Sequence, residues 1–96
     1  MAHYVVLGKY TEQGIRNIKE GPNRAKMVEQ ALQQAGGSMT SYYITMGEYD
    51  FLATVDLPND ETALRILMQI GQQGNVRTTT LKAFTRDEAA KILEGL

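Results

Sequence analysis

Cysteine is absent from this chain of 96 residues, and histidine occurs only once, as His3. Without cysteine the chain has no internal disulfide, no thiolate nucleophile and no sulfur ligand for a metal. A single histidine also removes the two-histidine sites that many oxygenases and zinc hydrolases use. A metal centre would need ligands from another subunit, so we expect a protein without metal or cofactor.

An excess of one charge is lacking as well, because ten Lys and Arg residues stand against eleven Asp and Glu residues. A protein that binds nucleic acid usually has a basic face, since phosphate neutralisation supplies most of the affinity. Apolar runs that approach the ~20 residues of a membrane span are also missing, and the first ten residues lack the pattern of a leader. We expect a cytoplasmic protein with neither nucleic acid nor membrane as partner.

The periodicity of the apolar residues predicts four strands and three helices. Strands are predicted at residues 3–10, 38–45, 51–57 and 76–84, and helices at 22–35, 60–73 and 86–93. Gly36 and Gly37 end the first helix, Asn59 caps the second, and Thr85 with Glu88 forms a capping box for the third. The second helix has only one narrow polar stripe, so we expect it to be buried over most of its circumference.

The order βαββαβ with a C-terminal helix is typical of the ferredoxin-like α+β fold. In this fold two helices cover one face of a four-stranded antiparallel sheet, and the other face is left open. A chain of 96 residues is expected to form one domain, residues 1–96.

The open face of the sheet is expected to be partly apolar. If Phe51 faces the helices, Leu52 and Thr54 lie on the open face. Depending on register, their neighbours there are Tyr42, Ile44, Val5 and Leu7. The face covers roughly 350 Å², the size at which an exposed apolar patch marks an interface, so we expect a homodimer. In the alternative the protein is a monomer whose open face is solvated by Lys9, Asp50, Thr78 and Thr80.

Residues 47–50, with the sequence GEYD, resemble the G-x-Y-D signature of the GYD-domain proteins. The resemblance covers nearly the whole chain, through YVVLGKYTEQG near the start, the region of Arg24, LPNDE after the third strand and NVRTTTLKAF before the last helix. It implies the dimeric α/β-barrel class, in which two ferredoxin-like sheets close face to face. Relatives by fold include cofactor-free monooxygenases, isomerases, haem-dependent enzymes and small-molecule-sensing domains, so no single activity is implied.

The stretch MGEYDF, residues 46–51, has a structural and a functional interpretation. In the structural one, Gly47 supplies a positive φ in a hairpin turn, and Asp50 accepts hydrogen bonds from nearby backbone amides. In the functional one, Asp50 lies at the mouth of a cavity with Tyr49 as a wall and acts as a proton acceptor.

The candidate site residues are polar and aromatic side chains near the strand ends. Asp50 and Tyr43 are the candidate catalytic residues, and the candidate ligand-binding residues are Lys9, Tyr49, Arg77 and Lys82. The basic ones suit a carboxylate or an enolate, although such residues are more often solvated or salt-bridged. Tyr42 and Tyr43 point to opposite faces, so at most one of them lines a given cavity. His3 is interpreted as a surface residue near a frayed terminus.

Three functions remain open at this point. The first asks least of the residues and is a homo-oligomer that binds a small-molecule ligand without an assigned activity. The second is a cofactor-independent monooxygenase or isomerase acting on a small acidic substrate, with Asp50 as the base and Lys9 and Arg77 as anion-binding groups. The third and most remote is RNA binding, since RNA-recognition motifs share this order of elements, but Glu48 and Asp56 would repel phosphate.

Overall fold

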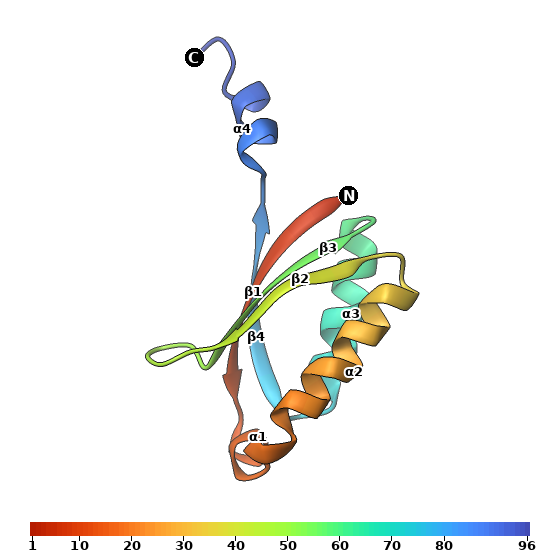
Figure 1. Ribbon diagram of the computed structural model, residues 1–96, viewed down its shortest axis with the longest axis vertical. Coiled ribbons are helices and arrows are strands. Elements are labelled where there is room, and N and C mark those ends of the chain that lie inside the picture. Colours follow the sequence, from red (N-terminus) through yellow and green to blue (C-terminus); the bar gives the residue numbers. More distant parts are fainter.

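The computed structural model describes residues 1–96 and confirms the predicted ferredoxin-like α+β fold, with a four-stranded antiparallel sheet in the order β2-β3-β1-β4 (Figure 1). The elements are β1 (Ala2–Tyr10), α1 (Glu12–Arg16), the 3₁₀ helix η1 (Ile18–Glu20), α2 (Gly21–Gln34), β2 (Ser38–Ile44), β3 (Phe51–Leu57), α3 (Asp60–Gln72), β4 (Val76–Ala83) and α4 (Arg86–Ile92).

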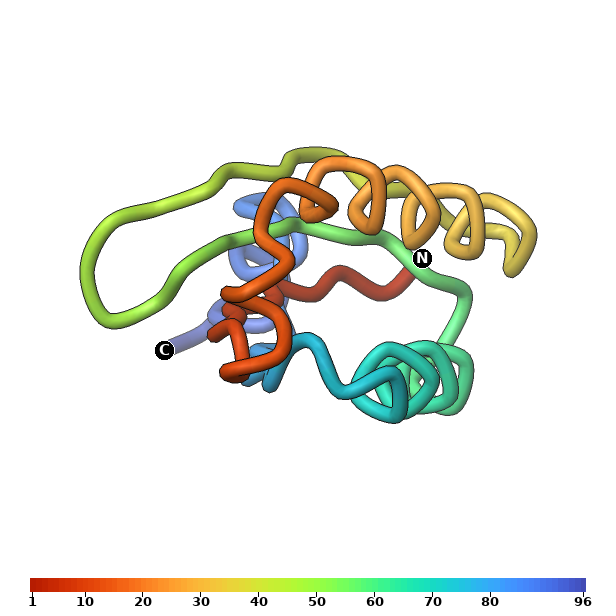
Figure 2. The backbone as a smooth tube through the Cα atoms, turned by 90° about the horizontal axis from the view of Figure 1, so that it is seen from below, coloured from red at the N-terminus to blue at the C-terminus, as the bar shows by residue number.

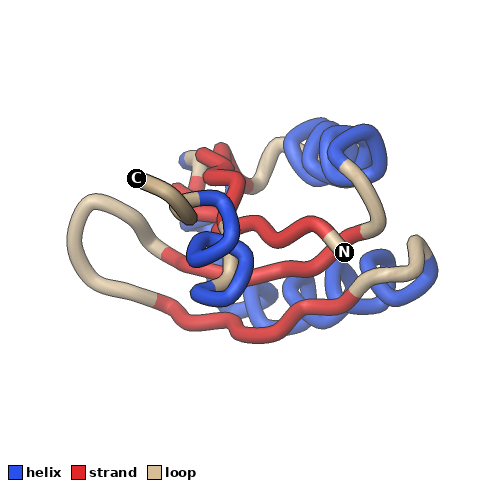
Figure 3. The backbone as a smooth tube through the Cα atoms, turned by 90° about the horizontal axis from the view of Figure 1, so that it is seen from above, coloured by secondary structure: helices blue, strands red, loops and turns tan.

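Two long helices lie on one side of the sheet, and the other side is uncovered (Figure 1). Seen from below, α2 and α3 lie on either side of β1 in the view (Figure 2), and they contact one another at only a few positions. The loop between β2 and β3 extends beyond the sheet on the side away from these helices (Figure 3). The helix α4 follows the end of β4 and stands clear of the sheet (Figure 1).

The local signals that begin the helices have the predicted geometry. The Asn59 side chain accepts a hydrogen bond of 2.9 Å from the amide of Thr62 at the start of α3. The Thr85 hydroxyl accepts from the amide of Glu88, and the Glu88 carboxylate accepts from the amide of Thr85, which completes the capping box of α4. Each contact satisfies amides that have no partner within the helix.

The face of the sheet that meets the helices is fixed by the pairing of β1 with β3. Tyr4 lies opposite Val55, and Val6 lies opposite Ala53, so these side chains point to the same side. The buried core lies between this side of the sheet and the two helices and consists of Tyr4, Val6, Leu32, Ala53, Val55, Leu57, Ala63 and Ile66. The prediction that the Phe51 face covers a core is therefore confirmed.

The expectation that Tyr42 and Ile44 lie on the open face is wrong. Tyr42 lies opposite Ala53, and Ile44 lies opposite Phe51, so both belong to the helix side. The cause is a register shift between Met39 and Ser41, where β2 contains one extra residue. Such a bulge reverses the alternation of faces beyond it, and this reversal brings Tyr42 to the core side.

On β4, at the other edge of the sheet, the residues that face the open side also differ from the expectation. Thr78 and Thr80 pair with Gly8 and Val6 and lie on the helix side, so they do not solvate the open face. Residues of β4 with the opposite parity, such as Leu81 opposite Val5, occupy the open face instead.

The helix α3 buries one stripe rather than most of its circumference. Ala63 and Ile66 are buried, but Leu64 and Met68 are 58% and 62% exposed. The reason is that the sheet and a short contact with α2 cover α3 on one side only, so that Leu64 and Met68 are left exposed. The expected burial of the whole helix is wrong for a single chain.

A close contact between Gly8 and Phe51 provides a test of the core packing. A β-carbon on Gly8 would overlap three atoms of the Phe51 ring. Replacing Gly8 with Ala therefore has to displace the ring, and we expect a loss of about 1–3 kcal/mol in the free energy of unfolding. Urea unfolding followed by circular dichroism measures this loss.

The matched control is Gly71→Ala in α3, where a β-carbon would meet nothing within 4 Å. This change is expected to leave the stability unchanged or to raise it by up to about 1 kcal/mol, since Ala favours helices over Gly. Equal stability of the two variants would contradict the packing described for Phe51.

Candidate functional site

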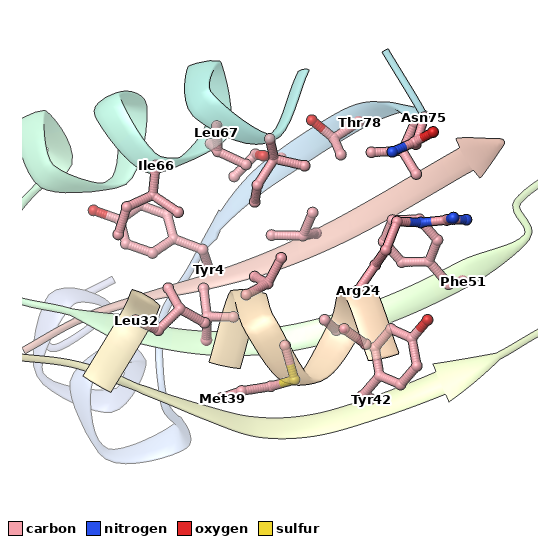
Figure 4. Close-up of a pocket in the computed structure, with 18 of the residues that line it drawn as sticks. Tyr4, Arg24, Leu32, Met39, Tyr42, Phe51, Ile66, Leu67, Asn75 and Thr78 are labelled. Atoms are coloured by element: carbon pink, nitrogen blue, oxygen red, sulfur yellow. The ribbon is translucent and has the colours of Figure 1, made fainter. Parts of the chain in front are cut away.

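A cavity of about 100 Å³ lies between the sheet and the helices α2 and α3. Of the 23 residues that line it, 17 are hydrophobic, and they come from all four strands and both helices. Figure 4 shows Tyr4, Leu32 and Ile66 toward one end of the cavity and Arg24, Tyr42, Phe51 and Asn75 toward the other. An apolar concave site with a few polar groups gathered at one end is the usual form of a small-molecule site.

Aromatic rings form the wall of the cavity at its polar end. The ring centroid of Phe51 lies 5.8 Å from that of Tyr10 and 5.9 Å from that of Tyr42, and both pairs are tilted. These distances are within the range of favourable aromatic contacts. Gly8 makes the arrangement possible, because the Phe51 ring occupies the space that a side chain at residue 8 would take.

The hydroxyl of Tyr10 is buried and makes no hydrogen bond of good geometry, but it lies close enough to the Tyr42 hydroxyl for a side-chain hydrogen bond between them to add to burial in raising the pKa of Tyr42. It is the only buried side-chain polar atom of the chain that lacks a well-formed hydrogen bond. A buried hydroxyl without a partner costs about 1–3 kcal/mol relative to one that is hydrogen-bonded. Gly21 lies beside it, since a β-carbon on that residue would stand 3.6 Å from the Tyr10 hydroxyl oxygen.

Tyr42 lies near Tyr10 and remains protonated over the physiological range. Burial, with the neighbouring Tyr10 hydroxyl as the second cause, raises the pKa of Tyr42 to about 12, and the positive charge of Arg24 acts in the opposite direction. The Tyr42 hydroxyl is therefore available as a hydrogen-bond donor at neutral pH.

Arg24 contributes the only formal charge to the lining of the cavity. Its guanidinium donates to the carbonyl of Asn17 over 3.2 Å and to the carbonyl of Gly14 over 3.4 Å. The side chain is partly buried, and no carboxylate forms an ion pair with it. The positive charge at this end of the cavity is thus not neutralised by the protein.

Asp50, the predicted base, holds the β2–β3 loop against β1 through two hydrogen bonds. Its carboxylate accepts a hydrogen bond of 2.9 Å from the amide of Tyr10, and its own amide donates to the carbonyl of Gly8 over 2.8 Å. Gly47 has a φ of 109° in the same loop, and a side chain there would meet nothing. These are the contacts that the structural interpretation expects of a hairpin turn.

Lys9, Tyr49 and Arg77 come together on the open side of the sheet. The Lys9 ammonium lies 5.3 Å from the centre of the Tyr49 ring, a cation–π distance, and Lys9 is opposite Arg77 in the pairing of β1 with β4. Tyr43 lies on the same side, opposite Leu52, and its side chain is 62% exposed.

Lys82 lies apart from the other predicted residues, beside the start of α3. Its ammonium donates to the two carboxylate oxygens of Asp60 over 2.8 and 3.0 Å, and the hydroxyl of Tyr4 donates to the same carboxylate. Hydrogen bonds from Lys82 and then from Tyr4 hold the pKa of Asp60 below its ordinary value. Burial is the first cause that raises the pKa of Tyr4 to about 12.

None of the six candidate residues chosen from the sequence lines the cavity. The polar residues that line it at the end near Phe51 and that sequence reasoning missed include Tyr10, Arg24 and Tyr42, and Gln73, Asn75, Thr78 and Thr80 line it as well. A signal existed for Tyr10, because it has the same parity on β1 as Tyr4 and Val6. No comparable signal existed for Tyr42, since its side depends on the bulge in β2.

His3 is held more firmly than a frayed surface residue. Its Nδ1 lies 2.6 Å from a carboxylate oxygen of Asp56, and its Nε2 lies 3.5 Å from one of Glu88. The side chain is 28% exposed. No group of three or more His, Asp and Glu side chains is arranged to hold a metal ion, and none of the helices has the length and apolarity of a membrane span.

Three comparisons relate the chain to known proteins. The family model described as the GYD domain matches residues 4–93. Over 84 residues the chain is 31% identical to a Thermus thermophilus protein named glutamine synthetase and cystathionine beta-lyase binding protein, covering 86% of this chain and 88% of that one.

Solved structures have the same fold. The crystal structure of FFRP-DM1 superposes with a TM-score of 0.62 at 19% identity, over 88% of this chain and 100% of that chain. A crystal structure of a Thermus thermophilus protein superposes with a TM-score of 0.55 at 25% identity, over 88% of this chain and 95% of that chain.

The contacts of Asp60 predict an acid-dependent contribution to stability. Because the folded-state pKa of Asp60 lies below its ordinary value of 3.8, the stabilisation is complete above that value and is lost as the pH falls through the folded-state pKa. Asp60→Asn is therefore expected to lower the melting temperature at pH 7, and the difference from the wild type should shrink below pH 3.8.

Glu61→Gln is the control, because Glu61 lies in the same first turn of α3 but makes no side-chain hydrogen bond. Both carboxylates lie near the positive end of the α3 dipole, but Glu61 makes no contact with Lys82. Melting temperatures are measured between about pH 2.5 and 7. If both variants lower the melting temperature by the same amount at each pH, the helix dipole alone explains the effect.

Proposed function

The chain belongs to the GYD-domain family, and on this premise we propose that it is a homo-oligomeric protein that binds a small ligand in the cavity between its sheet and its helices. The observation that carries the proposal is an otherwise apolar cavity at one end of which the Arg24 guanidinium, which has no carboxylate partner, lies together with the hydroxyls of Tyr10 and Tyr42. Polar groups gathered at one end of an apolar space orient a small ligand and give specificity. In this proposal residues 1–96 act as one domain.

The oligomer is proposed to form through the open side of the sheet. Leu81 and Tyr43 on this side are 50% and 62% exposed. A sheet face of roughly 350 Å² supplies less than half of the ≈ 800 Å² that each partner of a stable complex buries. Further surface is needed, and α4 offers it, because Ile92 and Leu93 are exposed and the helix stands clear of its own sheet.

Charge complementarity supports a dimer in which the strands of the two copies run in opposite directions. Lys9 and Arg77 lie near one end of the open side, and Asp56 and Glu88 lie at the other, roughly 20 Å away along β1. Reversed strands place the basic end of one copy over the acidic end of the other. The opposite arrangement would place like charges together.

A second candidate function is binding to other proteins. It is favoured by the relative that is 31% identical to this chain and whose name describes binding to glutamine synthetase and cystathionine beta-lyase. The two functions are compatible, since the cavity lies on the helix side and the exposed α3 residues Leu64 and Met68 are free of the sheet. Co-purification of those two enzymes with the immobilised chain tests this candidate, and their absence would count against it.

Ligand binding is tested with isobutanol, a small neutral molecule, by ¹H–¹⁵N NMR titration. We expect shifts of amides that line the cavity, such as those of Val28, Ala53 and Thr78. Ala53→Leu adds three carbon atoms to the cavity wall and is expected to abolish the shifts. Ala90→Leu, at an exposed position of α4, adds the same atoms elsewhere and should leave them unchanged. Shifts that persist in Ala53→Leu would refute binding in the cavity.

Assembly is tested by sedimentation velocity. The wild type is expected to sediment as a dimer, and Leu81→Glu is expected to dissociate it, because the change introduces a charge that has no partner at the proposed interface. Met68→Glu introduces the same charge at a similarly exposed position of α3 and should leave the dimer intact. A monomeric wild type, or a Leu81→Glu variant that stays dimeric, would contradict the proposed interface.

A further inference from the structure

We propose that the cavity takes a short aliphatic carboxylic acid, with its carboxylate held by Arg24, Tyr10 and Tyr42 and its carbon chain lying among the apolar lining residues. This inference rests on the proposed function, since it names the chemical class of the ligand that the cavity binds. A carboxylate ligand requires a positive charge and hydrogen-bond donors, and the groups at the polar end of the cavity provide both.

The positive charge comes from Arg24, which is partly buried at the cavity and has no carboxylate partner. Its two bonds to carbonyl oxygens leave part of the five-donor guanidinium free. A charged donor next to an apolar space binds an anion more strongly than a neutral acceptor, because the low local dielectric strengthens the attraction.

The start of α2 adds to the positive potential at the same end. Both Gly21 and Arg24 of its first turn line the cavity, and this turn contains no acidic residue. The N-cap residue Glu20 makes no hydrogen bond to the helix through its side chain. The positive end of the helix dipole therefore adds to the charge of Arg24, and the Glu20 carboxylate opposes it only through space, without a capping hydrogen bond.

The hydroxyls of Tyr10 and Tyr42 supply the donors. The buried Tyr10 hydroxyl lies beside the Tyr42 hydroxyl, and each can donate its proton to a ligand oxygen. A carboxylate offers about four acceptor positions, so it can receive both hydroxyls and the guanidinium at once. An alcohol or an amine offers fewer acceptor positions, and an amine would bring a second positive charge to Arg24.

The size of the cavity limits the length of the carbon chain. A cavity of about 150 Å³ holds benzene, which has six carbon atoms, so the space of about 100 Å³ found here accommodates about four non-hydrogen atoms. Acetate has this size when its carboxylate is counted, and propionate has one carbon atom more. A long fatty acid or an aromatic acid with two rings does not fit without movement of the helices.

The test compares propionate with propionamide, a neutral molecule of nearly the same shape, by NMR titration of the wild-type protein at neutral pH. We expect the dissociation constant of propionate to be at least about tenfold lower, as a charge-assisted hydrogen bond implies. Arg24→Gln should remove this preference. Arg16→Gln, which changes an exposed arginine paired with Glu12, should retain it.

Tyr10→Phe keeps the test decisive if Arg24→Gln loses stability along with its two carbonyl contacts. This variant removes a hydroxyl that makes no hydrogen bond of good geometry within the protein, so its melting temperature should change little, while propionate should bind about tenfold more weakly. Equal affinity for acid and amide in the wild type would overturn the carboxylate assignment and leave small-ligand binding intact. Binding of isobutanol together with failure of propionate, which has the same number of non-hydrogen atoms, would have the same meaning.

Discussion

The contact on which the candidate site depends is the packing of Phe51 against the bare backbone of Gly8. Because residue 8 has no side chain, the Phe51 ring takes up that space and reaches the rings of Tyr10 and Tyr42. The three rings then form one wall, and the two hydroxyls gather at one end of the cavity with Arg24. A larger residue at position 8 would push Phe51 into the space between the helices. The shape of the cavity is thus fixed by the smallest residue of β1.

Much of the fold could be predicted from the sequence because its signals are local. The alternation in β3 and the capping box of Thr85 and Glu88 depend on residues that are close together in the chain. The side to which Tyr42 points could not be predicted, because the bulge near Thr40 exists only when β2 pairs with β3. The exposure of Met68 was missed for a related reason, since the sequence shows which residues favour burial but not whether a neighbour is present to bury them.

The candidate site was harder to predict than the fold. Polar residues at strand ends, such as Lys9 and Arg77, attract attention as ligand-binding groups, but here they lie on the side of the sheet opposite to the cavity. Arg24 gave no sequence signal of its own, because an arginine in the first turn of a helix usually lies in solvent. Its position becomes informative only when the missing ion-pair partner and the neighbouring buried hydroxyl of Tyr10 are seen together.

Two consecutive residues of β1, Lys9 and Tyr10, point to opposite sides of the sheet. Lys9 belongs to the open side, where it lies over Tyr49, and Tyr10 belongs to the cavity, while Asp50 accepts a hydrogen bond from the amide that joins them. A movement of Tyr10 toward a ligand would therefore also move Lys9, through the peptide bond that joins them, and Asp50, through its hydrogen bond to this amide. Lys9 belongs to the basic end of the proposed interface. Any such coupling is reciprocal, since a ligand that strengthens assembly must itself bind more tightly to the assembled form. Because the path is so short, the affinity of the cavity and the stability of the oligomer are best measured as linked quantities.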